Sequence, residues 1–307
     1  MSSSLSSRHF GFLPSGQPVE AWTFCGAGGL TLEVLTYGGI VMRLLAPDRN
    51  GRLDDVVLGF DKLQPYAGNH PHFGAITGRV AGRITGAQFQ LDGKKYELVC
   101  NDPPNHLHGG IEGFYRKIWA ATPVDRADGA PSLRLTYRSA DGEEGYPGTV
   151  DVAVTYTVTN DNAFMIETEA TTDKATPFNL THHSYFNLAG EDAGSIEDHV
   201  LQIHSDEIAA TDGNMALLGK LVPVADQPND FNQPRRLGDV IAGLYKQHGD
   251  AYLVRRTLEH PSKLVTAARV TEPTTGRVME VSTTERYLQF YSGVSLDGTQ
   301  VGKSGKA

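Results

Sequence analysis

Cysteines and long apolar runs are scarce in this chain of 307 residues. Its two cysteines, Cys25 and Cys100, are too few for a disulfide framework and lack Cys-x-x-Cys spacing. This argues against a disulfide-rich scaffold, a zinc ribbon or a thiol redox site. No apolar run approaches a membrane span, and residues 1–16 lack the basic start and apolar centre of a secretory signal. The sequence therefore predicts a soluble, cytoplasmic protein with no membrane partner.

Positive charge is also limited. The chain has 27 Lys and Arg against 36 Asp and Glu, a formal net charge of −9, and its basic residues form no run. A nucleic-acid partner would leave a basic footprint, so none is expected. The chain also lacks a Gly-x-Gly-x-x-Gly fingerprint and a phosphate-binding loop ending in Gly-Lys-Ser/Thr. We therefore expect no nucleotide cofactor.

Short strand-like segments separated by turn residues dominate the chain. Asp92-Gly93 predicts a tight hairpin turn, and 237–245 is the best helical candidate. A chain of this length with 39% hydrophobic residues can still form one β-rich domain. The pattern predicts an all-β fold, an antiparallel β-sandwich or barrel with few short helices, over a single domain, 1–307. The expected strands are 30–37, 40–45, 56–60, 88–91, 95–98, 133–138, 149–158 and 164–171.

The segment 177–188 is predicted to be a buried strand that carries a site, because two histidines lie among aromatic, apolar and amide side chains. Successive side chains of a strand point to opposite faces, so His182 and His183 cannot enter one cavity together. His183 shares a face with Thr181 and Tyr185. A neutral histidine in an apolar wall is a candidate general acid or base, whereas the alternative is a hydrogen-bonded core histidine. We favour the first interpretation for His183 and the second for His182.

Two arginines interrupt the glycine-rich apolar segment 74–84. Arg79 and Arg83 each present a planar set of donors, which suits a carboxylate or the hydroxyls of a sugar. The alternative for each residue is a structural ion pair.

Two histidines of the segment 105–110 have a spacing that is typical of metal ligands. His106 and His108 would share one face of an extended segment. Together with His183, His248 and Asp250 they could hold zinc or iron, as in a metal-dependent hydrolase. No His-Glu-x-x-His motif or cysteine ligand supports that interpretation, so no metal is expected.

Two polar residues stand out in the last third of the chain. Asp250 is placed at the entrance of an expected strand, where a turn residue is the ordinary explanation. Gln289 lies in the apolar half of the β run 283–293 and would need hydrogen-bond partners if buried. A polyhydroxylated ligand could supply them.

Taken in order, several motifs resemble the aldose 1-epimerase (galactose mutarotase) family. They include Leu-His-Gly-Gly at 107–110, Asp-Gly-Glu-Glu-Gly-Tyr-Pro-Gly at 141–148, and the segments 78–84, 179–188, 288–291 and 296–298. The resemblance implies a large β-sandwich that interconverts the α- and β-anomers of hexoses such as galactose and glucose without a cofactor. It implies a general acid, His183, and a monomer or weak homodimer. The substrate-binding residues that it implies are Arg83, His108, Ser184, Tyr185, Asp250 and Gln289.

The chain departs from the family pattern at several positions. Gly82 and His182 each stand where the family has asparagine, and Ala251 replaces a histidine. In the family a glutamate beyond Leu-Asp-Gly acts as the catalytic base, and no counterpart lies within these 307 residues. We therefore expect a domain that lacks the family's last strands, with an incomplete sheet margin. An alternative is a non-catalytic carbohydrate-binding β-sandwich.

Overall fold

The computed structural model of the chain describes residues 3–244, 249–256, 263–303 and 305. The chain forms two compact units. The first consists of Met1–Pro47, Arg52–Phe186 and Val301–Ala307, and the second of Asp48–Gly51 and Asn187–Gln300. The single domain expected from the sequence stays a prediction.

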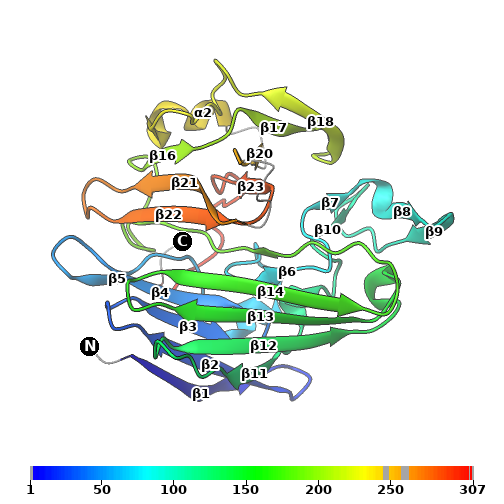
Figure 1. Ribbon diagram of the computed structural model, residues 1–307, viewed down its shortest axis with the longest axis horizontal. Coiled ribbons are helices and arrows are strands. Elements are labelled where there is room, and N and C mark those ends of the chain that lie inside the picture. Colours follow the sequence, from blue (N-terminus) through cyan, green and yellow to red (C-terminus); the bar gives the residue numbers. More distant parts are fainter. Residues whose placement is uncertain (1–2, 245–248, 257–262, 304, 306–307) are drawn as a thin grey trace. The chain divides into compact units, whose positions relative to one another are not determined.

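Two antiparallel sheets make up most of the first unit (Figure 1). One sheet has five strands in chain order, β1 to β5, and the other has four, β11 to β14, of which β12, β13 and β14 run side by side in Figure 1. Their bounds are β1 Ser4–Phe12, β2 Pro18–Cys25, β3 Thr31–Leu35, β4 Val41–Pro47, β5 Leu53–Asp55, β11 Ala120–Pro123, β12 Ser132–Ser139, β13 Val150–Val158 and β14 Phe164–Thr172.

Short elements outside these two sheets carry most of the motifs. Three two-stranded ladders pair β6 with β15, β7 with β10 and β8 with β9. The bounds are α1 Leu63–Ala67, β6 Ile76–Thr77, β7 Arg83–Ile84, η1 Thr85–Ala87, β8 Gln88–Leu91, β9 Lys94–Glu97, β10 His106–Leu107, η2 Phe114–Arg116, η3 Glu143–Gly145 and β15 Thr181–His182.

Local sequence explains most of these elements. Apolar side chains of β13, such as Val154 and Tyr156, are buried, and the Tyr156 hydroxyl donates to the Gly39 carbonyl at 3.0 Å. Asp92 and Gly93 both have positive φ, which is the turn expected between β8 and β9.

The strand predicted at 56–60 is wrong, because β5 ends at Asp55. Beyond that residue the backbone turns to unrelated partners. Val57 bridges Phe186, and the Phe60 amide donates to the Tyr66 hydroxyl. Such isolated contacts do not continue a ladder.

The second unit contains two four-stranded antiparallel sheets, in the orders β19-β16-β21-β22 and β18-β17-β20-β23. Leu201, Phe231 and Tyr252 belong to its buried core. The helix expected at 237–245 appears as two short pieces, and Tyr245 lies outside the described residues. The bounds are β16 Val200–Ile203, β17 Glu207–Thr211, β18 Leu217–Pro223, β19 Arg235–Arg236, η4 Leu237–Asp239, α2 Ile241–Leu244, β20 Asp250–Leu253, β21 Val265–Thr271, β22 Val278–Thr283 and β23 Tyr287–Phe290.

Among the described residues, no helix combines the length and the apolar character that crossing a membrane requires.

Candidate functional site

The segment 177–188 is extended only in part. β15 covers Thr181 and His182 alone, so the buried strand expected over the whole segment is wrong. The backbone of His183 still bonds to the 74–75 stretch. Its amide donates to the Ala75 carbonyl at 2.9 Å, and its carbonyl accepts from the Gly74 amide at 3.0 Å. The ladder is short because Asn179 and Phe186 each form an isolated bridge to a different segment.

The two adjacent histidines point to different surroundings. His182 lies edge-on to Tyr156 and Phe164, with ring centroids 6.0 and 5.8 Å away. His183 packs instead against Tyr185, with 5.2 Å between ring centroids, and Tyr185 contacts Phe73 at the same distance. This is the divergence that the period of an extended chain predicts.

Three imidazoles form a cluster that includes His183. The ring centroids of His108 and His72 lie 5.2 and 5.7 Å from that of His183, and 5.0 Å from each other. His108 was predicted to lie in the site, but His72 was not. The only sequence signal for His72 is its place in Asn-His-Pro-His-Phe-Gly, directly before the glycine-rich segment.

Pairing between β7 and β10 brings Arg83 next to His108. Leu107 is the register partner of Arg83, and the His108 amide donates to the Gly82 carbonyl at 3.0 Å. The Arg83 Nε donates to the Asp102 carboxylate at 2.7 Å. Arg83 therefore forms a structural ion pair, which was the alternative to a binding role. It also lies near the His108 imidazole of the cluster.

His106 and His108 do not share a face. His108 has a φ of 51°, in the left-handed region, so the extended segment ends before it. The buried His106 ring contacts the Tyr146 hydroxyl at 2.8 Å and the Val99 carbonyl at 2.7 Å. His108 instead uses its Nδ1 to accept from the Gly82 amide at 3.2 Å.

His106 and His108, on which the zinc or iron alternative depended, therefore do not point to one site. His248 falls outside the described residues. Among the residues that are described, no three His, Cys, Asp or Glu side chains are arranged to hold a metal ion.

Arg79 has a structural environment. Its side chain is 2% exposed and its guanidinium donates to the Ser139 hydroxyl and to three carbonyls, those of Ala140, Pro147 and Gly148, at 2.8 to 3.0 Å. These acceptors flank or belong to the motif 141–148. These hydrogen bonds of Arg79 hold that motif in place. Their acceptors are a hydroxyl and carbonyls, and not the carboxylate of the structural ion pair given as the alternative.

Ser184 and Tyr185 follow His183 in the same segment. Ser184 Oγ lies 3.5 Å from the His182 Nε2, so it contacts the neighbouring histidine and not the imidazole cluster. The Tyr185 ring packs against the His183 ring.

Asp250 and Gln289 belong to the second unit and lie at one end of the β20–β23 pair. Asp250 is the register partner of Phe290, and Gln289 that of Ala251. The Asn229 amide donates to the Asp250 carboxylate at 2.8 Å. Burial raises the pKa of Asp250, and this hydrogen bond opposes the rise. Gln289 is exposed, so its amide does not need protein hydrogen-bond partners as a buried amide would.

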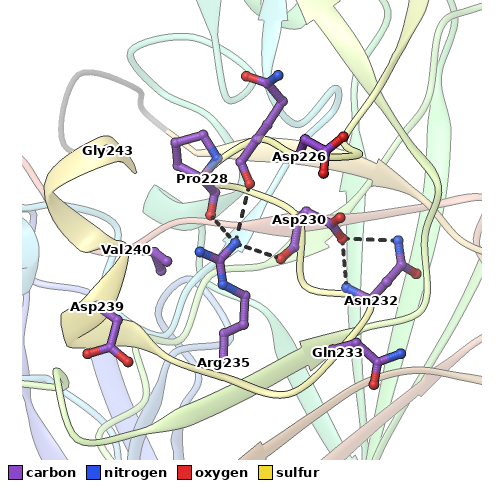
Figure 2. A pocket seen from close by; sticks show the side chains of 10 residues that line it. Asp226, Pro228, Asp230, Asn232, Gln233, Arg235, Asp239, Val240 and Gly243 are labelled. Atoms are coloured by element: carbon purple, nitrogen blue, oxygen red, sulfur yellow. Dashed lines mark hydrogen bonds between the residues drawn. The ribbon is translucent and has the colours of Figure 1, made fainter.

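A surface cavity of about 530 Å³ opens elsewhere on the second unit (Figure 2). Arg235 lies in it and donates to the Gln227, Pro228 and Asp230 carbonyls at 3.1 to 3.4 Å. These bonds hold the surrounding loop. The lining includes none of the predicted site residues, so the cavity gives no support to that site.

Burial disfavours a positive charge on all three imidazoles of the cluster. Burial lowers the pKa of His183. Burial lowers the pKa of His72 and His108 too, and in both cases a charge on His183 lowers it further. Burial and repulsion between the imidazoles therefore disfavour more than one proton on the cluster.

Acid should destabilise the protein through its buried histidines. Burial, followed by Arg116 and His183, lowers the pKa of His70 to about 4, below the usual value of about 6.5. The unfolded chain therefore binds the proton first. The stability that depends on neutral His70 is complete above about pH 6.5 and falls as the pH drops toward 4. Urea unfolding at pH 7, 5.5 and 4.5 measures this loss.

His70→Phe should reduce the loss of unfolding free energy between pH 7 and pH 4 by up to about 3 kcal/mol. His70 is 8% exposed and lies among Phe60, Tyr66 and Phe73. An unchanged slope in the variant would contradict this assignment.

Comparison with known proteins places the chain in a family. The family model described as "Aldose 1-epimerase" matches residues 20–307. A galactose mutarotase of Sus scrofa is 40% identical over 296 residues, which are 96% of this chain and 84% of that protein. An aldose 1-epimerase of Haemophilus influenzae is 33% identical over 93% of this chain and 82% of that protein. The crystal structure of a galactose 1-epimerase from Lactobacillus acidophilus matches with a TM-score of 0.85 at 23% identity, covering 99% of this chain and 88% of that one.

The fold defines a class, that of β proteins of the galactose mutarotase-like type, and the first unit carries the imidazole cluster. The chain belongs to the aldose 1-epimerase family. This confirms the predicted family, the all-β fold and an isomerase that interconverts anomers. A non-catalytic carbohydrate-binding module and a metal-dependent hydrolase are not favoured.

Proposed function

We propose that the chain interconverts the α- and β-anomers of free aldohexoses such as galactose and glucose, with His183 as the general acid. The observation that supports this role is the position of His183, whose ring packs against Tyr185 and lies 5.2 and 5.7 Å, between ring centroids, from those of His108 and His72. Burial and repulsion between these imidazoles disfavour a second proton on the cluster.

The proposed reaction moves two protons and breaks one bond. A base removes the proton from the C1 hydroxyl while His183 donates its proton to the ring oxygen, and the bond between C1 and that oxygen breaks. The C1–C2 bond then rotates, and closure reverses both proton transfers to give the other anomer. Each positioned proton-transfer group contributes about 10²–10⁴-fold. No residue of this chain is assigned as the base.

Predicted residues of the first unit orient the sugar in this proposal. The neutral His108 ring accepts from the Gly82 amide at Nδ1 and so carries its proton on Nε2, which makes it a donor toward a hydroxyl. Arg83 offers a further donor. Tyr185, which packs against His183, is proposed to complete the contacts, whereas the contact of Ser184 with His182 does not support a role for Ser184. We place the protein in the cytoplasm as a monomer or weak homodimer.

Polarimetry on freshly dissolved α-D-galactose and α-D-glucose tests the reaction. We expect optical rotation to reach its equilibrium value faster than in buffer, in proportion to enzyme concentration. A folded protein that binds galactose in a calorimeter but leaves the rate of mutarotation unchanged would overturn the proposal in favour of a binding module.

A further inference from the structure

His72 has a backbone conformation that only its surroundings can maintain. Its φ is 61°, a left-handed value that is uncommon for residues other than glycine. Its amide donates to the His70 carbonyl at 2.8 Å, and its own carbonyl accepts from the Ala75 amide at 3.1 Å. Backbone outliers of this kind cluster at active sites and at ligand-binding positions.

The ring of His72 is held by residues that are fixed in turn. It lies edge-on to Tyr115, with ring centroids 4.5 Å apart. The Tyr115 hydroxyl donates to the carbonyls of Gly110 and Ile111 at 2.9 and 3.0 Å. The adjacent Arg116 donates to the Ala67 and Gly68 carbonyls, at 3.1 and 2.9 Å, at the end of α1 ahead of the histidine. The ring is therefore preorganised beside His108 and His183.

The chemistry of the ring suits a hydroxyl group. Burial, and after it the imidazoles of His183 and His70 and the charge of Arg116, lowers the pKa of His72 to about 3. A neutral imidazole carries one donor and one acceptor, so it can bond with a hydroxyl group, which also donates and accepts. The side chain is half-buried, so part of it is accessible.

We propose that His72 binds a hydroxyl group of the aldohexose directly, at C2, C3, C4 or C6, as a third imidazole beside His108 and His183. This inference rests on the proposed function, because it assigns His72 to the same sugar. The role is binding and specificity, whereas the proton transfer stays with His183. The competing interpretation is a histidine that only packs against Tyr115.

A double cycle between protein and substrate distinguishes the two interpretations. The kinetic parameters are measured for wild type and His72→Phe with galactose and with its 2-, 3-, 4- and 6-deoxy analogues. His72→Phe retains an aromatic ring against Tyr115 but removes both polar atoms. We expect about a 10-fold rise in KM for galactose with kcat within about threefold, as for an interaction made equally in the ground and transition states.

One deoxy analogue should identify the hydroxyl. Wild type should lose about 10-fold in kcat/KM on that analogue, and His72→Phe should lose nothing further. Equal additional losses on all four analogues, or a loss confined to kcat, would overturn the proposal. His72→Gly, which also removes both polar atoms and tolerates a left-handed φ, replaces the phenylalanine variant if thermal unfolding shows that the latter misfolds.

The same cycle keeps the two proposals separate. If wild type binds galactose without accelerating mutarotation, the proposed function fails, and the cycle is then run on Kd by calorimetry. Coupling between His72 and a single hydroxyl would still support the inference, whereas additive effects or the absence of galactose binding would overturn it.

Discussion

Replacing His183 with asparagine is expected to lower kcat/KM for mutarotation by about 10²–10⁴-fold, the contribution of a positioned general acid. Asparagine fills similar space and can hydrogen-bond, but it cannot give a proton to the ring oxygen. The neighbouring imidazoles of His72 and His108 are not expected to take over, because their ring centroids lie 5.7 and 5.2 Å from the position of the His183 ring. Polarimetry and proton NMR spectroscopy of the anomers of D-galactose measure the loss in rate.

The adjacent residue provides the matched control. His182 carries the same side chain one position earlier but packs against Tyr156 and Phe164. His182→Asn introduces the residue that the family resemblance places there, and it should leave kcat/KM within about threefold. If both substitutions reduce the rate equally, or neither does, His183 is not the acid.

Arg79→Met should strongly destabilise the protein, with a loss of about 3–5 kcal/mol in the free energy of unfolding. Methionine matches much of the apolar stem but leaves the Ala140, Pro147 and Gly148 carbonyls without the donors that reach them at 2.9 to 3.0 Å. Unsatisfied buried carbonyls are costly because nothing replaces their hydration. Urea unfolding measures the difference.

Arg138→Met tests whether burial is the cause. Arg138 is paired with Asp151 at 2.7 Å, but its side chain is 72% exposed. An exposed pair contributes less than about 1 kcal/mol, so this variant should unfold almost as the wild type does. Equal losses for the two arginines would show that the hydrogen bonds of Arg79 do not set its contribution. At temperatures where Arg79→Met remains folded, its mutarotase activity should persist.

Local patterns were sufficient to predict much of the fold. The β8–β9 hairpin follows from alternating side chains around Asp92-Gly93, whose positive φ values depend on those two residues. The strand expected at 56–60 failed because apolar content alone does not show where pairing stops. In the structure pairing ends at Asp55, and later residues bond to partners far along the chain.

For the site, the sequence by itself determined the family motifs and the separation of His182 from His183, since both depend on neighbouring residues and on the twofold period of an extended chain. Only the tertiary structure decided that His72 joins His108 and His183, that His106 turns away to Tyr146, and that Arg79 is enclosed by the motif 141–148. Each of these depends on contacts between segments tens of residues apart and, at His72 and His108, on left-handed backbone that local preference disfavours. The packing of the folded chain supplies the energy that holds them there.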